Sequence, residues 1–211
     1  MRPSVTRISG KSVLFVMATQ QEFGPHLQAR IMPLITGVGP IEAAIATATA
    51  LSQLAHDKAL PDLVVSLGSA GSARLDHCGL YQATAVAWRD MDATGLGFAR
   101  GVTPFLDLPA TLPLDLRLSG IARATLSTGA TIVSGSMYDT IPQDMVDMET
   151  FAILRACMVA QVPLIALRGI SDGHATLTGL HDWVEYLHII DEKLAAAVEI
   201  LKSDLANGLL G

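Results

Sequence analysis

Short apolar runs alternate along the chain with segments of helical periodicity. The runs are rich in β-branched and aliphatic residues and end in glycine, serine, threonine or an acid; they cover residues 12–19, 31–39, 63–71, 83–90, 130–135 and 163–172. Continuous runs of this length are typical of strands that are buried on both faces. Residues 99–128 contain three prolines and show weak periodicity, so we expect a loop with one short helix there.

Helical patterns lie between these runs. Residues 41–58 carry apolar side chains at helical spacing, at Ile41, Ala44, Ile45 and Ala48, and residues 150–161 form a second helical segment. A last helix has one apolar face, formed by Trp183, Leu187, Ile190, Leu194, Val198 and Leu201. Strands that alternate with helices predict an α/β fold, here a single domain over residues 1–211, with a mixed, mostly parallel central β-sheet flanked by helices.

This fold class predicts where a ligand binds. In open α/β sheets, ligands lie beyond the carboxyl ends of the strands. Glu22, Ser69, Glu149 and Asp172 all follow soon after strand-like runs. A carboxylate beside apolar surface is poorly solvated, so it needs hydrogen-bond partners, a raised pKa or a catalytic role.

Composition indicates a soluble, cytoplasmic protein. Hydrophobic residues make up 50% of the chain and charged residues 16%, but the apolar stretches are shorter than the roughly 20 residues of a membrane-spanning helix. The N-terminal apolar run is short and lacks a convincing cleavage site, which argues against a signal peptide. Cys78 and Cys157 stand in different sequence contexts and suggest a reducing compartment without a disulfide framework.

Charge and aromatic content argue against a nucleic-acid partner. The formal net charge is −6, lysine and arginine form no cluster, and aromatic residues make up only 5%. Nucleic-acid binding needs a basic surface and often stacking platforms, and both are missing. The high apolar content predicts surface that another subunit covers, so we expect a homodimer and no membrane partner.

Several familiar motifs are incomplete or absent. Residues 37–44 begin like a dinucleotide fingerprint but lack the third glycine and the later acid, which favours a simple tight turn. The glycine-rich stretch 68–73 suits either a ligand-contacting loop or a structural turn. The six histidines are not spaced like metal ligands, and we expect His174 to be a solvated loop residue. The chain contains neither a GxSxG sequence nor a Walker sequence. We therefore expect neither a metal nor a cofactor.

The acidic residues that remain each have a structural alternative. Asp172 lies in SDGH after a strand, where an aspartate often caps a helix or a turn. Glu149 begins a helix, where a carboxylate interacts favourably with the helix dipole. Taken separately, these positions leave the structural and the catalytic interpretation open.

Taken together, the segments resemble a known family. VDMET (146–150), followed by LIALRGISDGH (164–174), resembles the paired signature of the nucleoside phosphorylase and nucleosidase superfamily, especially the 5′-methylthioadenosine/S-adenosylhomocysteine nucleosidases. The resemblance extends to residues 17–23, 36–40, 67–71 and 134–139, and it covers roughly residues 12 to 200. The resemblance implies the three-layer sandwich fold of that family. It also implies the activity of an adenosyl nucleosidase, whose substrate is a small adenine nucleoside.

The resemblance also implies a role for each acid. Asp172 looks like the general acid that protonates N7 of the purine. Glu149 looks like the ribose ligand that stabilises the oxocarbenium-like transition state, with Met148 packing beside the sugar. Glu22 looks like the residue that positions and deprotonates the attacking water. Such a division suits the reaction, because cleavage builds positive charge on the sugar and negative charge on the base.

Four further residues complete the implied site. Tyr138 would stack on adenine, and Ser69 would lie near the ribose and the water. Arg168 and Ser171 would support the acidic groups. The first strand leads to a glutamate without an arginine, which favours water over phosphate as the nucleophile; phosphate would need another arginine, such as Arg89 or Arg100.

The sequence departs from the family pattern at two places. Ser136 stands where the family commonly has aspartate, and two glutamines precede Glu22 in place of a more acidic run. These changes leave the 5′ substituent open, including a lipid-linked or futalosine-type nucleoside. Two other functions also stay open: a phosphate-dependent transferase like the purine nucleoside phosphorylases, and a catalytically silent nucleoside-binding protein.

Overall fold

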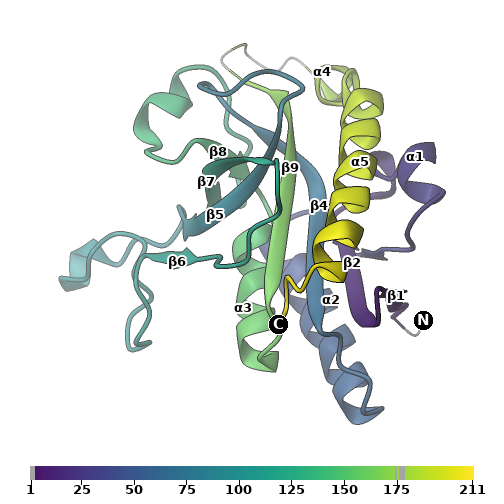
Figure 1. Ribbon diagram of the computed structural model, residues 1–211. Coiled ribbons are helices and arrows are strands. Elements are labelled where there is room, and N and C mark those ends of the chain that lie inside the picture. Colours follow the sequence, from purple (N-terminus) through teal and green to yellow (C-terminus); the bar gives the residue numbers. More distant parts are fainter. Residues whose placement is uncertain (1–2, 174, 176–178) are drawn as a thin grey trace.

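A mixed β-sheet runs through the structure, with helices on either side (Figure 1). The computed structural model describes residues 3–173, 175 and 179–211. Its strands are β1 (Thr6–Ile8), β2 (Lys11–Met17), β3 (Leu34–Ile35), β4 (Leu63–Gly71), β5 (Leu80–Trp88), β6 (Thr111–Pro113), β7 (Ala122–Thr128), β8 (Met145–Asp147) and β9 (Leu164–Asp172). Its α-helices are α1 (Pro25–Gln28), α2 (Pro40–His56), α3 (Thr150–Ala160), α4 (Leu180–Val184) and α5 (Leu187–Ala206), and its 3₁₀ turns are η1 (Gln20–Glu22), η2 (Thr94–Leu96) and η3 (Gly135–Thr140).

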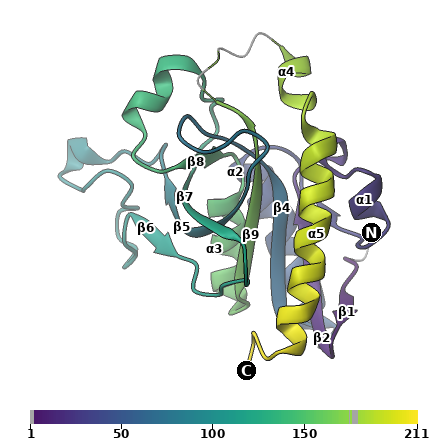
Figure 2. The same cartoon turned by 45° about the horizontal axis from the view of Figure 1, so that its top comes forward.

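Five of these strands close into a ring. Strand β4 pairs with β9, β9 with β5, β5 with β7, β7 with β8, and β8 with β4 again. The β4–β9, β5–β7 and β7–β8 pairs are parallel, whereas β9–β5 and β8–β4 are antiparallel. Figure 2 shows β5, β7 and β8 curling away from β4 and β9. The predicted mixed, mostly parallel sheet flanked by helices is confirmed, and its closure is an added feature.

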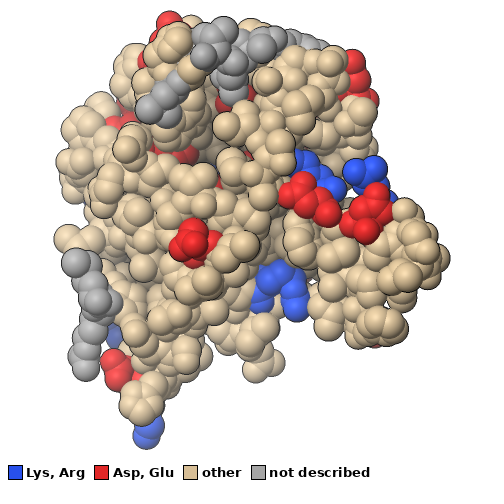
Figure 3. Space-filling view, turned by 180° about the vertical axis from the view of Figure 1, so that it is seen from behind, with Lys and Arg blue, Asp and Glu red and all other residues tan. Residues whose placement is uncertain are grey.

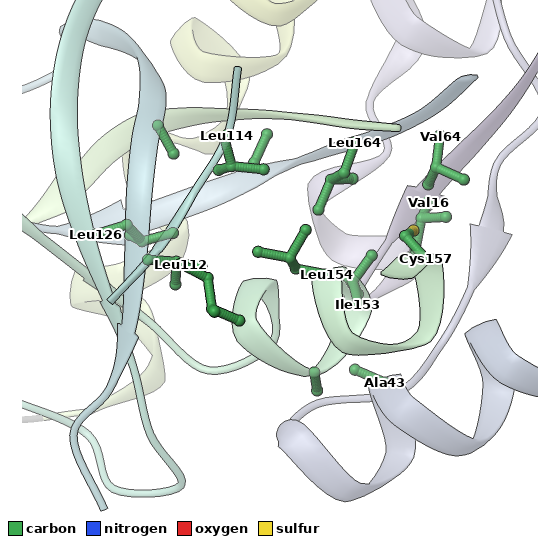
Figure 4. Packing of buried hydrophobic residues seen from close by; sticks show 14 of the residues in the cluster. Val16, Ala43, Val64, Leu112, Leu114, Leu126, Ile153, Leu154, Cys157 and Leu164 are labelled. Carbon is green, nitrogen blue, oxygen red and sulfur yellow. The ribbon is translucent and has the colours of Figure 1, made fainter. Parts of the chain in front are cut away.

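Two apolar clusters cover the two faces of the sheet. One lies between the sheet and helices α2 and α3, where Ile153, Leu154 and Cys157 of α3 face the strands (Figure 4). The other packs α5 against β2, β4 and β9, with Leu194, Val198 and Leu201 almost fully buried. Burying such side chains stabilises the fold by about 1.5–3 kcal/mol each. These clusters fix the strand ends that carry the acidic residues.

The weakest predictions fell in the middle of the chain. Residues 99–128 were expected to form a loop with a short helix, but they form no helix and supply β6 and β7. Strand β7 has no continuous apolar run, because its polar side chains alternate with buried Ala124 and Leu126. The predicted strand at residues 130–135 is also wrong, since this segment is a loop that leads into η3.

Two helices also differ in detail from the prediction. The last helix breaks into α4 and α5 at Tyr186, whose ring packs edge-on against His77 with centroids 4.2 Å apart. In α2, three of the four predicted apolar positions are exposed, namely Ile41 (70%), Ile45 (58%) and Ala48, whereas Ala44 packs against the core. The face of α2 that packs inward carries Ala43, Thr47, Ala50, Leu51 and Leu54.

Candidate active site

The predicted acids meet at one edge of the sheet, because the strand register brings several strand ends together. Gly71, the last residue of β4, pairs with Asp172 of β9 and with Val146 of β8. Asp147, the last residue of β8, pairs with Thr128 of β7. Viewed from behind, acidic atoms are recessed in the upper part of the molecule, where most of the surrounding surface is uncharged (Figure 3).

Glu22 lies in η1, just beyond strand β2, and is 6% exposed. Its Oε1 accepts hydrogen bonds from both the backbone N–H and the hydroxyl of Ser69, each at 2.7 Å. Its Oε2 is buried and has no hydrogen-bond partner among the described residues. Burial raises the pKa of Glu22, and the two Ser69 bonds oppose that rise. The carboxylate is thus held by one oxygen, which leaves the other able to accept a proton.

Glu149 occupies the N-cap position of α3 without capping the helix. Its Oε1 instead accepts the backbone N–H of Gly39 at 2.9 Å, from a glycine whose φ of +98° suits no other residue. The first amides of α3 are bound by Asp147 and Thr128. Burial, and next the negative charge of Asp147, raise the pKa of Glu149 to about 7. Glu149 thus stands at the start of α3, where a carboxylate interacts favourably with the helix dipole, but its hydrogen bond goes to Gly39 and not to the helix.

Asp172 ends strand β9 and is bound on both oxygens. Ser171 donates to Oδ1 at 2.7 Å, and Tyr138 of η3 donates to Oδ2 at 3.2 Å. Burial raises the pKa of Asp172 despite these two bonds. Gly71 makes room for this pair, because a Cβ at that position would lie 2.7 Å from Asp172 Oδ2 and would overlap the Tyr138 hydroxyl.

Arg168 supports the site less directly than expected. Its guanidinium pairs with Asp147 Oδ2 through Nη2 at 3.0 Å and Nε at 3.1 Å, and it also binds Ser66 and Thr150. It influences Glu22 and Glu149 through its charge, which lowers the pKa of both. Arg168 thus holds β4, β8, β9 and the start of α3 together beneath the acids.

The structure brings together most of the predicted residues. Glu22 and Ser69 are bonded to each other, as are Asp172, Tyr138 and Ser171, while the charges of Glu22 and Glu149 interact. Met148 is half-buried beside Glu149 in the chain. His174 lies outside the described residues.

Two residues at this edge were not predicted. Asp147 collects hydrogen bonds from Arg168, Thr150 and Thr128, and its position directly before Met148 and Glu149 at a strand end was the available signal. Trp183 of α4 donates from Nε1 to Ser69 Oγ at 2.9 Å. The sequence placed Trp183 on an apolar helix face, which gave no sign of this bond.

Comparison with known proteins identifies the family. The model of the Phosphorylase superfamily matches residues 22–202, which include every predicted site residue. The chain belongs to the Phosphorylase superfamily.

Curated and solved members of the Phosphorylase superfamily are similar to this chain. The 5′-methylthioadenosine/S-adenosylhomocysteine nucleosidase of Haemophilus influenzae (strain PittEE) is 31% identical over 163 residues, 68% of each chain. The nucleosidase of that name from Actinobacillus succinogenes is 29% identical over 162 residues, 67% of each chain.

Solved structures share the fold. The Neisseria meningitidis nucleosidase in complex with methylthio-immucillin-A superimposes with a TM-score of 0.74 at 24% identity, covering 90% of this chain and 98% of that one. A futalosine hydrolase mutant of Helicobacter pylori gives a TM-score of 0.72 at 16% identity, covering 91% and 98%.

Arg89 and Arg100 were the two residues considered as possible phosphate ligands. Their contacts therefore bear on whether phosphate or water is the nucleophile. Arg89 lies at the end of β5, close enough to Glu149 for their charges to interact. Its Nη1 donates to the carbonyls of Ser127 and Asp147 at 2.7 and 2.9 Å, and its Nη2 donates to those of Gly129 and Thr131 at 3.2 and 2.6 Å. These four bonds hold the guanidinium in the loop structure. Arg100 is exposed.

Proposed function

We propose that the protein hydrolyses the N-glycosidic bond of a 5′-substituted adenosine, such as 5′-methylthioadenosine or S-adenosylhomocysteine, and releases adenine. The observation that carries this proposal is the state of Glu22, whose Oε1 is fixed by Ser69 while its buried Oε2 is free to accept a proton from water. The relatives named as nucleosidases support the substrate class.

The geometry supports one role for each acid. Burial raises the pKa of Asp172, so its carboxyl can hold the proton that the departing adenine needs at N7. Its bond to Tyr138 is longer than its bond to Ser171, which makes Oδ2 the oxygen more easily released to the base. Glu149 would bind a ribose hydroxyl, with Met148 beside the sugar, and its carboxylate would stabilise the positive charge on the ribose.

The reaction then balances without a cofactor. Water adds to the anomeric carbon as the bond to adenine breaks, Glu22 takes one proton from the water, and Asp172 gives one proton to N7. The adenine leaves neutral and the sugar keeps the hydroxyl. General acid and base assistance of this kind typically accelerates a reaction about 10²–10⁴-fold.

The two rival functions have less support from these contacts. A phosphate-dependent transferase would need a cation at the nucleophile, and the side chain of Arg89 is bound to four backbone carbonyls. A silent binding protein would have no need for two buried carboxyl groups and a partly buried one, all with raised pKa values.

One experiment separates these functions. The protein is incubated with 5′-methylthioadenosine in ¹⁸O-labelled water, with and without phosphate, and adenine and sugar are analysed by mass spectrometry. Hydrolysis predicts phosphate-independent release of adenine and one ¹⁸O atom in the sugar. Adenine that appears only with phosphate would establish the transferase, and no adenine from a panel of adenine nucleosides would establish the binding protein. Glu22→Gln, which keeps the shape of the side chain, should slow turnover by at least about 100-fold without abolishing the binding of adenine.

We further propose that the chain is one domain over residues 1–211 and assembles as a homodimer in the cytoplasm. The exposed apolar surface of α2 and of the turn before it supports a subunit contact, because Ile41 and Ile45 of the helix and Val38 of the turn leave a hydrophobic surface beside Gly39, which binds Glu149. Light scattering after size-exclusion chromatography should give twice the 22.2 kDa chain mass. Ile41→Asp with Ile45→Asp should give the monomer.

Free thiols at Cys78 and Cys157 support a reducing compartment. None of the described helices has the length and apolar character needed to cross a membrane.

A further inference from the structure

Trp183 forms a hydrogen bond that links helix α4 to the Glu22 carboxylate through one intermediate side chain. Its indole ring packs against the apolar cluster on the α5 side of the sheet, while its Nε1 lies 2.9 Å from Ser69 Oγ. Ser69 Oγ in turn lies 2.7 Å from Glu22 Oε1. The three side chains come from α4, β4 and η1, so the contact is set by the tertiary fold.

The chemistry of the three groups fixes the direction of these bonds. An indole N–H can only donate, and an ionised carboxylate can only accept. A serine hydroxyl has one proton and can both donate and accept. Because Trp183 must donate to Ser69, the single proton of Ser69 is directed at Glu22.

We propose that Trp183 is a positioning residue that acts through Ser69: its N–H holds the Ser69 hydroxyl in the orientation that donates to Glu22 Oε1, which keeps Glu22 Oε2 directed at the attacking water. The effect on catalysis rests on the proposed hydrolysis, whereas the hydrogen-bonded relay itself does not. Without the indole N–H, the Ser69 hydroxyl is free to rotate away from Glu22. Only the Ser69 backbone N–H would then hold the carboxylate firmly.

The relay has a consequence for the protonation of Glu22. Hydrogen bonds to a carboxylate favour its charged form, and the Ser69 hydroxyl is the largest influence that lowers the pKa of Glu22 against the effect of burial. The charged groups that also act on Glu22 are Arg168 of β9, Asp147 of β8 and Glu149 at the start of α3. Trp183→Phe leaves these three groups in place and keeps the aromatic packing. The pKa of Glu22 should therefore rise in this variant.

The first test needs no substrate. The titration of the Glu22 carboxyl carbon is followed by ¹³C NMR in protein labelled at glutamate, with the signal assigned by its loss in Glu22→Gln. Trp183→Phe should raise the midpoint by about half a pH unit, in line with the modest net strength of a neutral hydrogen bond. Trp88→Phe is the matched control, because it is the other tryptophan and its Nε1 has no hydrogen-bond partner in the described part of the chain. The control should leave the midpoint unchanged.

A double-mutant cycle tests whether Trp183 acts through Ser69. In a Ser69→Ala background, adding Trp183→Phe should produce no further change in the Glu22 midpoint, because the hydroxyl that transmits the effect is absent. An equal shift in both backgrounds would show that Trp183 acts by packing, and it would overturn the proposal. No shift in the wild-type background would overturn it as well.

Kinetics then connect the relay to the reaction. The acid limb of the kcat/KM profile should move upward with the Glu22 midpoint, and kcat should fall roughly three- to tenfold with little change in KM. Failure of the proposed function would appear separately, as absence of adenine release by the wild-type protein while the NMR shift remains. A fall in kcat without a shift of the acid limb of the kcat/KM profile would contradict the positioning role of Trp183.

Discussion

Replacing Glu149 by glutamine should make the protein more stable above neutral pH while it removes activity. Glu149 is 9% exposed and its Oε1 accepts the N–H of Gly39, a bond that the glutamine carbonyl can keep. Burial and the charge of Asp147 raise its pKa from the usual 4.5 to about 7 in the folded protein. Above that pH the folded chain carries an ionised carboxylate that would be better solvated in the unfolded chain.

The size and sign of the effect follow from proton linkage. Between pH 4.5 and 7 the folded state binds more protons at Glu149 than the unfolded state does, so the stability of the wild-type protein falls as pH rises through this window. At about 1.4 kcal/mol per pH unit, the full difference is on the order of 3 kcal/mol, which is an upper bound because Glu149 interacts with other charged groups in the site. Glu149→Gln should thus match the wild type near pH 4.5 and exceed it by about 2–3 kcal/mol at pH 8.

Urea unfolding measured at several pH values between 4.5 and 8 checks this prediction. Glu192→Gln is the control, because Glu192 is an exposed glutamate of α5, where a surface substitution should change stability by less than about 0.5 kcal/mol. A difference between Glu149→Gln and wild type that stays constant over this pH range would show that the Glu149 carboxylate does not have a raised pKa in the folded protein. A variant that is less stable than wild type at pH 8 would contradict the prediction as well.

Three further predictions test other contacts of the site. Asp172→Asn should lower kcat by at least about 100-fold with an unchanged circular dichroism spectrum, because the amide has no acidic proton; near-normal turnover would exclude Asp172 as the acid. Gly71→Ala should lower kcat/KM by about 100-fold, since the added Cβ displaces Asp172 and Tyr138. Gly95→Ala is its control: the added Cβ would meet no other atom within 4 Å, so kcat/KM should not change. Asp147→Asn should destabilise the protein by about 3–5 kcal/mol in urea, because Arg168 is left as a buried charge without its partner. Glu199→Gln, which removes two exposed ion pairs, with Arg30 and Lys202, should cost less than about 1 kcal/mol, and equal losses in these two variants would contradict the expected difference.

The elements that the sequence predicted well are those whose pattern is set by local burial. Strands β4 and β9 lie between two apolar clusters, so their apolar runs mark their full length. Strand β7 was missed because its own sequence alternates polar and apolar residues like a surface strand. Its position in the sheet depends on pairing with β5 and β8. Closure of the ring depends in the same way on pairing between segments far apart in the chain, which no local pattern records.

The acids of the candidate site were predicted from the motif resemblance, but the hydrogen bonds of Glu22 and Glu149 were not. Glu22 and Ser69 are 47 residues apart, and Glu149 meets the N–H of Gly39 across 110 residues. Such bonds depend on the tertiary fold. A backbone N–H is present at almost every residue, so the sequence does not indicate which one will donate. The pairing of Arg168 with Asp147 was missed for a related reason, because the two residues are 21 positions apart and the sequence does not distinguish Asp147 from Glu149 or Asp172 as the partner of the arginine.

The distribution of positive charge explains how three carboxyl groups can keep raised pKa values so close together. Within the described part of the chain, the hydrogen bonds to Glu22, Glu149 and Asp172 come from neutral donors, namely serine, tyrosine and backbone groups. The buried guanidinium of Arg168 is paired with Asp147, and that of Arg89 is bound to backbone carbonyls. A cation bonded directly to any of the three acids would lower its pKa, so that a proton donor would already be ionised at neutral pH and a proton acceptor would be a weaker base. A site built to bind phosphate needs the opposite arrangement, with cations facing the ligand, so the placement of these two arginines favours water as the nucleophile.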